Sequence, residues 1–446
     1  MQIKFLIEIF KKNANCNALI WRDKTYKYNC LLKKIIYWKK YLKEKKIQPG
    51  FVIGLEGDFS PNTIAILLCL IDMNCIIVPF DYSQRTKNQK KYKLAKLKYL
   101  ITIDANDCVN FKEYNETPHY DYYNILRKNN RPGLVLFTSG SSGEPKAAVH
   151  DFSRLLDKFK TKRKSLSTLN FLLFDHWGGL NTMFHTLYNG GIVISVIDRK
   201  PDAVCRLIEK YKLELLPASP TFLTLMIMSG AYQRWDLSSL KIISYGTEPM
   251  PKSVLLHLNK LFPNVRLLQT YGLIELGVLR SKSKSNDSLW VKIGGEGYEV
   301  RVIDDMLQIK AESAMVGYLN APSPFTEDGW FITGDKVLQD GDYFKILGRE
   351  SEIINVGGEK VYPAEVESVI LEMDNISEVR VYGEKNPIIG NIVCADVRLK
   401  KDVDHKLFIS RLKKYCRQKI QKYKIPIKIR IDKKRQYSDR YKKKRV

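Results

Sequence analysis

Apolar and polar positions follow two alternating periods along the first part of the chain. Short apolar runs at Phe51–Leu55 and Cys75–Pro79 have the length of buried strands. Tyr28–Lys43 before the first run and Thr63–Met73 between the two runs carry apolar residues at the spacing of a helix face. Strands that alternate with helices are typical of βαβ units, whose strands run in parallel. The pattern therefore predicts an α/β domain built on parallel sheets.

The same alternation continues to residue 270 and then changes character. Further strands are expected at Leu100–Ile103, Leu134–Phe137, Phe171–Phe174, Ile192–Val196, Leu213–Ala218, Lys241–Tyr245 and Arg266–Thr270. Further helices are expected at Leu180–Tyr188, Asp202–Tyr211 and Lys252–Phe262. After Gly277, short strands separated by turns predict a small antiparallel or barrel-like piece. These strands are Leu289–Lys292, Glu299–Ile303, Met306–Lys310 and Tyr343–Leu347.

A smaller α/β unit is predicted at the end of the chain. Its expected helices are Pro363–Glu372 and Lys406–Ile420, and its expected strands are Glu378–Gly383, Ile392–Leu399 and Ile427–Ile431. With 446 residues, the chain exceeds what one core normally supports. We place the domain boundary near Gly348–Ser351, with residues 1–347 in a large domain and 352–446 in a small one.

The strongest chemical signal is the segment Thr138–Lys146, which reads Thr-Ser-Gly-Ser-Ser-Gly-Glu-Pro-Lys directly after an apolar run. Glycines allow the backbone to approach a ligand closely, and amides and hydroxyls can surround an anion. A lysine adds a positive charge, and the spacing of the usual P-loop is absent. The segment is predicted to bind a polyphosphate. The residues expected to contribute are Thr138, Ser139, Gly140, Ser141, Ser142, Gly143 and Lys146.

This segment resembles the phosphate-binding loop of the adenylate-forming enzymes, which include acyl-CoA and aryl-CoA synthetases, peptide-synthetase adenylation domains and luciferases. Ala147 stands where that family usually has glycine. Tyr271-Gly-Leu-Ile-Glu275 is similar to a second motif of the family. The resemblance implies that Tyr271 stacks on adenine and that Glu275 binds Mg²⁺, a cation that prefers carboxylate and phosphate oxygens. Ile274 replaces the usual threonine.

Other blocks extend the resemblance over nearly the whole chain. Tyr245–Pro251 matches a wall of the adenine pocket, and Thr333-Gly-Asp335 offers a carboxylate for the ribose hydroxyls. Arg349 is a candidate for a second ribose or phosphate contact. The resemblance assigns to the nucleotide Gly246, Thr247, Glu248, Thr270, Tyr271, Gly272, Asp335 and Arg349.

The C-terminal part carries the remaining blocks. Gly357 and Gly358 would approach the second substrate, and the string around them favours coenzyme A as the acceptor. Lys442 takes the place of the lysine that reaches the carboxylate and α-phosphate, with Lys443 as the alternative. Tyr441 replaces the glycine that precedes this lysine. Ser351 takes the place of the hinge residue about which the small domain rotates.

Phe174–Gly179 takes the place of the acyl-pocket gate, and His176 matches a histidine common in acyl-CoA and aryl-CoA synthetases. Asp175 leaves open the pairing with an amino group that amino-acid-adenylating relatives use. We also expect apolar side chains to line the acid pocket: Trp177, Met183, Phe222 and Met226.

The resemblance implies a two-step ligase. ATP and Mg²⁺ serve the formation of an acyl-adenylate from a carboxylic acid, and the thiol of coenzyme A then displaces AMP. A carrier-protein thiol or an amino acid substrate remains an alternative. Catalytic roles are implied for Lys442, Lys146 and His176.

Composition adds one competing hypothesis. The net charge is +26, and from residue 400 onward 20 Lys and Arg face 4 Asp. Such charge can bind nucleic acid or an anionic membrane, but no nucleic-acid-binding motif accompanies it, so we expect no nucleic-acid partner. The sequence shows no transmembrane run and no clear signal peptide. Eight scattered cysteines fit a reducing cytoplasm.

Overall fold

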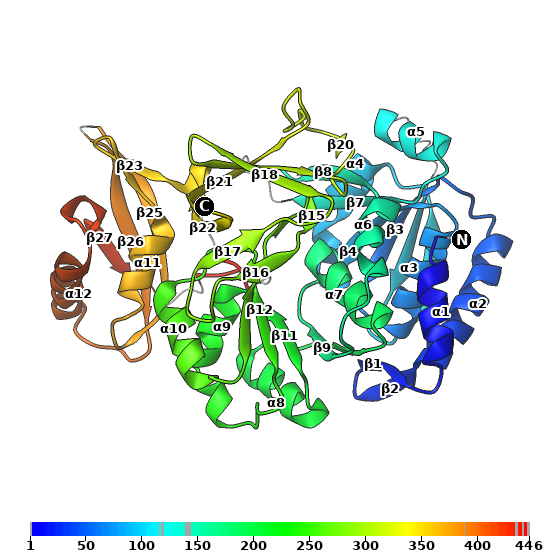
Figure 1. Ribbon diagram of the computed structural model, residues 1–446, viewed down its shortest axis with the longest axis horizontal. Helices are drawn as coiled ribbons and strands as arrows, with labels where there is room; N and C mark the ends of the chain where they lie inside the picture. The colour runs from blue at the N-terminus through cyan, green and yellow to red at the C-terminus, as the bar shows by residue number, and fades with distance from the viewer. Residues whose placement is uncertain are drawn as a thin grey trace.

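The computed structural model describes residues 2–114, 116, 120–138, 144–387, 389–432, 436–438 and 441–443. A large N-terminal part and a small C-terminal part lie side by side, with the small part at one end of the molecule and the N-terminus at the other (Figure 1). Within the described residues, no helix has both the length and the apolar character needed to cross a bilayer.

The first large sheet has seven strands in the order β13–β12–β11–β9–β10–β1–β2. Their bounds are β1 Asn17–Trp21, β2 Lys24–Lys27, β9 Ser167–Asn170, β10 Ile192–Ser195, β11 Leu215–Ala218, β12 Ile242–Tyr245 and β13 Arg266–Gln269. Neighbouring strands pair in parallel except β1 and β2, which form an antiparallel hairpin at the edge. The predicted parallel arrangement is therefore confirmed here, with one antiparallel edge strand added.

The second large sheet also has seven strands, in the order β20–β8–β7–β4–β3–β5–β6. Their bounds are β3 Val52–Gly57, β4 Ile76–Asp81, β5 Tyr99–Ile103, β6 Val109–Glu113, β7 Gly133–Thr138, β8 Lys146–Asp151 and β20 Gly317–Tyr318. The inner strands pair in parallel, and β3 and β4 are buried along their whole length, as continuous apolar strands of parallel sheets are. Strands β6, β8 and β20 pair antiparallel.

Helices pack on both faces of these sheets. Those of the large part are α1 Lys4–Lys12, α2 Tyr28–Glu44, α3 Pro61–Asp72, α4 Gln89–Ala95, α5 Asp121–Lys128, α6 Phe152–Asp157, α7 Trp177–Tyr188, α8 Pro201–Tyr211, α9 Pro220–Met228 and α10 Lys252–Leu261. Helices α3 and α9 each begin with a serine cap followed by proline, a typical start signal. One core cluster joins α3 and α7 with Leu55 of β3 and Val193 of β10, so these helices pack between the two sheets.

An antiparallel sheet follows, as the short strands predict. Its order is β16–β17–β22–β21–β19–β18, and a two-stranded ribbon, β14–β15, precedes it. The bounds are β14 Gly272–Leu273, β15 Gly277–Val278, β16 Ser281–Ser283, β17 Trp290–Ile293, β18 Tyr298–Ile303, β19 Met306–Ala311, β21 Phe331–Asp340 and β22 Tyr343–Arg349.

The small part contains a five-stranded sheet with two helices. The strands are β23 Ile354–Val356, β24 Glu359–Val361, β25 Ile376–Asn386, β26 Gly390–Leu399 and β27 Lys428–Ile431, and the helices are α11 Pro363–Ile370 and α12 His405–Lys419. Helix α11 contacts α10 of the large part. One core cluster extends from β11 and α9 to β25, β26 and α12, so the two parts share apolar packing.

One predicted strand is wrong. Strand β9 ends at Asn170, and Phe171–Phe174 leaves the sheet as a turn. The ring of Phe171 is instead buried against Phe222 of α9, with ring centroids 4.5 Å apart. Side-chain packing, and not strand pairing, explains the apolar run.

Candidate functional site

Strands β7 and β8 hold the two ends of the hydroxyl-rich segment. Thr138 and Lys146 are partners in the antiparallel pairing of these strands, so the two ends of the segment lie side by side at the end of the sheet. The predicted contacts Ser139, Gly140, Ser141, Ser142 and Gly143 lie outside the described residues. Asn320 fixes the exit of this connection, because its amide accepts from Ala147 N at 2.9 Å and donates to Pro145 O at 2.9 Å.

Tyr318 links the predicted phosphate-binding lysine to the predicted metal-binding carboxylate. Its hydroxyl donates to Glu275 Oε1 at 2.6 Å, and Lys146 Nζ lies 5.5 Å from its ring centroid. A cation at this distance over an aromatic ring is attracted to the ring face. Burial and the neighbouring Glu275 raise the pKa of Tyr318, so the hydroxyl stays protonated and donates. Strand β20 places Tyr318 beside β8, where it pairs with Ala148.

Glu275 fits a Mg²⁺ ion that is shared with a substrate. Among the described residues there is no group of three His, Cys, Asp or Glu side chains that could enclose a metal. A single carboxylate is nevertheless sufficient for Mg²⁺, which usually binds through one or two carboxylates together with phosphate oxygens and water. Glu275 would therefore hold the ion jointly with the phosphates of ATP.

A second group joins Tyr271, Asp335 and Arg349. The Tyr271 hydroxyl donates to Asp335 Oδ2 at 2.6 Å, and Arg349 Nε lies 2.8 Å from Asp335 Oδ1. Burial raises the pKa of Asp335, and the Arg349 guanidinium opposes that shift. A carboxylate has about four lone-pair sites, so Asp335 retains capacity to accept ribose hydroxyls. The Tyr271 side chain expected to stack on adenine is 7% exposed.

The ends of β12 and β13 meet at Gly246 and Thr270. A Cβ atom at Gly246 would lie 2.5 Å from Thr270 Oγ1 and 2.6 Å from its carbonyl oxygen, so only glycine fits. Thr247 has φ +74°, a conformation that is uncommon outside glycine and often marks functional sites. Gly272 follows directly in β14, which pairs with β15. The structure thus brings four of the predicted nucleotide residues, Gly246, Thr247, Thr270 and Gly272, to the ends of neighbouring strands.

Glu248 connects this region to the end of the chain. Its Oε1 accepts from Thr221 N at 2.7 Å and its Oε2 accepts from Lys443 N at 3.1 Å. Ser219, the cap of α9, donates from Oγ to Tyr441 O at 2.5 Å. The C-terminal tail, described at residues 436–438 and 441–443, therefore contacts two different segments of the large part.

The tail presents Lys442 to a cavity that His176 and Thr247 also line. His176 caps α7, and its Nδ1 accepts from Gly178 N at 3.1 Å, so a neutral ring carries its proton on Nε2. Lys443, the alternative lysine, instead lies 2.7 Å from the buried carboxylate of Glu367. The two neighbouring lysines thus have different surroundings.

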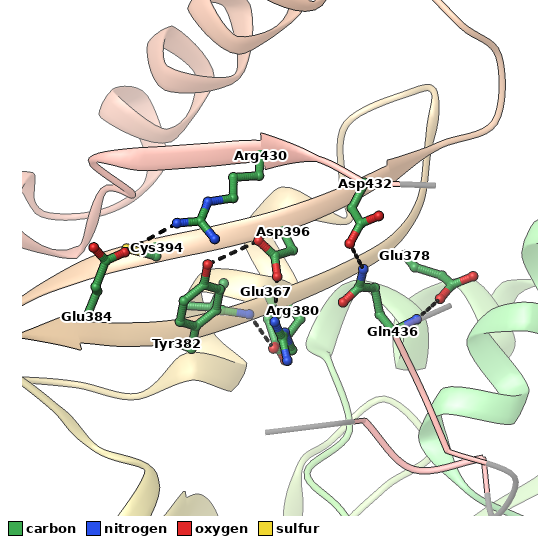
Figure 2. Close-up of polar contacts among 11 residues, drawn as sticks. Glu367, Glu378, Arg380, Tyr382, Glu384, Cys394, Asp396, Arg430, Asp432 and Gln436 are labelled. Atoms are coloured by element: carbon green, nitrogen blue, oxygen red, sulfur yellow. Dashed lines mark hydrogen bonds and ion pairs between the residues drawn. The ribbon is translucent and has the colours of Figure 1, made fainter. Parts of the chain in front are cut away.

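The small part anchors the start of the tail. Gln436 N donates to Glu378 Oε2 at 2.8 Å (Figure 2). Arg398 lies 2.5 Å from the other oxygen of Glu378. Figure 2 also shows Arg380 and Tyr382 directed at Asp396, with distances of 2.6 and 3.1 Å. The hydrogen bond to Glu378 attaches the tail to β25 before it reaches the large part, and the contacts of Asp396 hold β25 and β26 together.

Some predicted residues lie away from this region. Gly357 and Gly358 form the exposed turn between β23 and β24, with φ +60° and +93°. Ser351 lies in a short turn after β22, where the neighbouring Glu350 is 3.2 Å from Lys336 Nζ. Asp175, by contrast, directly precedes His176 and is buried, at 6% exposure.

Two of the side chains expected to line the acid pocket, Trp177 and Met183, belong instead to the core around α3 and α7. Phe222 packs beside Tyr441, and Met226 is buried in the core cluster that reaches the small part.

Sequence reasoning missed Tyr318, Asn320 and Glu367. Tyr318 and Asn320 come a few residues after strand β19, and no pattern in the sequence connects them with residues 145–147. The only signal for them in the sequence is that Tyr318 and Asn320 alternate with the apolar Leu319, as residues on opposite faces of a strand do.

Comparison with known proteins gives consistent matches. The family described as AMP-binding enzyme matches residues 8–319, and the family described as AMP-binding enzyme C-terminal domain matches residues 365–435. The indoleacetate–CoA ligase of Aromatoleum aromaticum is 30% identical over 296 residues, which cover 60% of this chain and 57% of that protein. The chain thus spans less than two thirds of that relative's length.

Other proteins match over more of their length. The 2-succinylbenzoate–CoA ligase of Listeria innocua is 25% identical over 444 residues, covering 93% of this chain and 92% of that protein. The crystal structure of the anthranilate CoA ligase AuaEII in complex with anthranoyl-AMP superposes with a TM-score of 0.81 at 19% identity. It covers 97% of this chain and 93% of that one, so the fold is the same from end to end.

Proposed function

Because the chain belongs to the AMP-binding enzyme family, we propose that it is an AMP-forming ligase that joins a carboxylic acid to coenzyme A through an acyl-adenylate. The observation that carries this proposal is the position of Lys442, which the C-terminal tail presents to a cavity beside His176 and Thr247. The cavity lies next to the predicted nucleotide residues, so an acid bound there has its carboxylate near ATP and near a cation.

In the first step, a carboxylate oxygen of the acid attacks the α-phosphorus of ATP. The bond between the α-phosphorus and the bridging oxygen breaks, and pyrophosphate leaves with the electron pair. Lys442 stabilises the charge that gathers on the α-phosphate and the carboxylate, and Lys146 stabilises the departing pyrophosphate. Correct placement of the two reactants supplies much of the rate enhancement.

Mg²⁺ supplies charge neutralisation at the phosphates when it is bound at Glu275. Tyr318 orients the Glu275 carboxylate through its hydrogen bond and keeps Lys146 over its ring. Asp335 accepts the ribose hydroxyls, and Arg349 holds the Asp335 carboxylate in place. Each of these side chains is thereby fixed before the nucleotide arrives.

In the second step, the thiolate of coenzyme A attacks the carbonyl carbon of the acyl-adenylate, and AMP leaves. The tail contacts the large part through hydrogen bonds to Ser219 and Glu248 and through the ring of Tyr441, so this contact is small enough to be broken and remade during turnover. We propose that the small part turns about residues 348–351 between the steps, which withdraws Lys442 and brings Gly357 and Gly358 toward the thiol. Such a rotation is a hinge motion.

A carrier-protein thiol is the second candidate acceptor. Helix α12 exposes Arg411, Lys414 and Arg417 along one side of the small part. A basic helix of this kind suits an acidic partner protein, because complementary charge speeds association. Coenzyme A also carries phosphates, so the charge alone is compatible with either acceptor.

We place the enzyme in a reducing compartment, the cytoplasm, because each of its eight cysteines is present as a thiol.

The test follows each half-reaction separately. A panel of aryl, short-chain and long-chain acids is incubated with ATP, Mg²⁺ and labelled pyrophosphate, and acid-dependent exchange of label into ATP is measured. We expect exchange with at least one acid class, followed by thioester formation when coenzyme A is added. Absence of exchange over the whole panel contradicts the proposal. Thioester formation only with a phosphopantetheinyl carrier protein identifies the alternative acceptor.

A further inference from the structure

Tyr441 places an aromatic ring against the large part of the molecule, although it belongs to the C-terminal tail. Its ring centroid lies 5.6 Å from that of Phe171 and 5.5 Å from that of Phe222. On the other side it stacks on Tyr437 at 5.3 Å and an interplanar angle of 23°. The side chain is 5% exposed. The ring is therefore built into a cluster to which both parts of the molecule contribute.

The backbone at Tyr441 is held in a conformation that favours glycine. Its φ is +51°, in the left-handed region that bulky residues rarely occupy. Tyr441 N donates to Ser438 O at 2.9 Å, and Tyr441 O accepts from Ser219 Oγ at 2.5 Å. A tyrosine in this conformation needs compensation from its surroundings. The aromatic cluster around the ring provides that compensation.

The ring also forms one wall of the cavity at Lys442. Phe171, Leu172, Leu173 and Arg199 line this cavity together with His176, Thr247, Tyr441 and Lys442. Its volume is about 20 Å³, which is room for about one water molecule. Because consecutive residues supply the cation and the wall, the same tail that positions Lys442 also limits the space beside it.

We propose that Tyr441 is a specificity-determining residue that restricts the enzyme to compact carboxylic acids, such as short-chain or single-ring acids. The inference rests on the proposed function, since it assigns this cavity to the acid. Phe171 and Tyr441 both line the cavity, and the ring of Phe222 packs against both of them. A long acyl chain meets the Tyr441 ring, whereas a compact acid needs only a modest displacement of the ring.

The direct test replaces Tyr441 with glycine, which accepts the positive φ without strain. Acid-dependent pyrophosphate exchange is measured with benzoate, butyrate and dodecanoate for the wild-type protein and for Tyr441→Gly. We expect the ratio of kcat/KM for dodecanoate to kcat/KM for benzoate or butyrate, whichever is the better substrate, to rise about 10-fold or more in the variant. Tyr441→Phe keeps the ring and is expected to keep the wild-type ratio.

A matched control separates the wall from the stability of the tail. Tyr437→Ala removes the ring that stacks on Tyr441 but leaves the cavity wall, so it is expected to lower activity toward all acids alike. A thermal shift with ATP verifies that each variant is folded. An unchanged ratio in a folded Tyr441→Gly protein, or a wild-type protein that already prefers dodecanoate, overturns the inference and leaves the proposed function intact. No exchange with any acid by wild-type protein overturns the proposed function itself.

Discussion

Tyr318 Oη lies 2.6 Å from Glu275 Oε1, and this hydrogen bond joins strand β20 to the turn between β14 and β15. The backbone strengthens the connection, because Met315 N donates to Glu275 O at 2.7 Å. With Lys146 over the Tyr318 ring, three segments that are far apart in the sequence meet at the predicted phosphate and metal site.

Replacing Tyr318 with phenylalanine removes the hydrogen bond to Glu275 and keeps the ring beneath Lys146. A hydrogen bond to a charged group contributes about 1.5–3 kcal/mol, so we expect adenylation to slow by about 10- to 100-fold. The Mg²⁺ concentration for half-maximal exchange should rise as well. Tyr318→Leu also removes the ring and should additionally raise KM for ATP. Equal Mg²⁺ dependence in the wild-type and Tyr318→Phe proteins contradicts this role.

Arg349 holds Asp335 through a partly buried ion pair at 2.8 Å. Arg349→Lys keeps the charge but loses the fork that binds Asp335 and Thr333 O together. We expect KM for ATP to rise by about 10-fold, measured by ATP titration of the exchange reaction. Arg301→Lys is the matched control, since its partner Asp328, at 2.9 Å, is far more exposed than Asp335 and the pair should contribute little to ATP binding.

The two adjacent lysines of the tail should respond differently to substitution. Lys442→Ala is expected to slow adenylation by about 100-fold or more and to spare the reaction of preformed acyl-adenylate with thiol. Lys443→Met leaves the buried Glu367 without its cation and should lower the free energy of unfolding by about 3 kcal/mol. Lys406→Ala, at an exposed site of α12, serves as the neutral control. Loss of both half-reactions in Lys442→Ala argues against its assignment.

Lys158 predicts a pH dependence of stability. It donates to Asn181 Oδ1 at 2.7 Å and to Val278 O at 2.6 Å, and burial lowers its pKa from 10.5 to about 7. Between pH 7 and 8.5 the unfolded chain binds this proton and the folded protein releases it, so stability rises with pH. The slope is at most about 1.4 kcal/mol per pH unit.

Urea unfolding at pH 7.0 and 8.5 measures this effect. Below pH 7, Lys158 is charged in both the folded and the unfolded state, so the full free-energy cost of burying its charge lowers the stability of the protein. The free energy of unfolding of Lys158→Met should change less with pH over the same interval. Buried thiols, whose pKa values burial raises, oppose this trend as the pH approaches 8.5, and they do so equally in the wild-type protein and in Lys158→Met. A wild-type protein whose stability rises no more than that of Lys158→Met between these pH values rules out the assignment.

Much of the fold could be predicted because periodicity is a local property. Helix α2 and strand β4 each show their type within their own residues, and their observed bounds differ from the predicted ones by one or two residues. The failure at Phe171–Phe174 has the same origin. An apolar run indicates that its side chains are buried, but it does not indicate whether a neighbouring strand or an aromatic cluster buries them.

The antiparallel strands β8 and β20 were not predicted for a related reason. Pairing between Tyr318 and Ala148 brings together residues that are 170 positions apart. A contact between residues so far apart produces no periodic pattern in the sequence. Yet this pairing positions Tyr318 and Asn320 at the site. The motifs identified the groups that carry charge, and the strand pairing supplied the residues that hold those groups.

The sequence by itself determined which chemical groups are available: hydroxyls, a lysine, an aromatic ring and carboxylates in short motifs. It also determined the α/β framework and the separate small C-terminal part. Only the tertiary structure decided how the tail is used. It turns Lys442 toward the cavity and Lys443 toward Glu367, and it buries Tyr441 against Phe171 and Phe222. Motif chemistry resides in contiguous residues, whereas these contacts depend on the path that the chain takes through space.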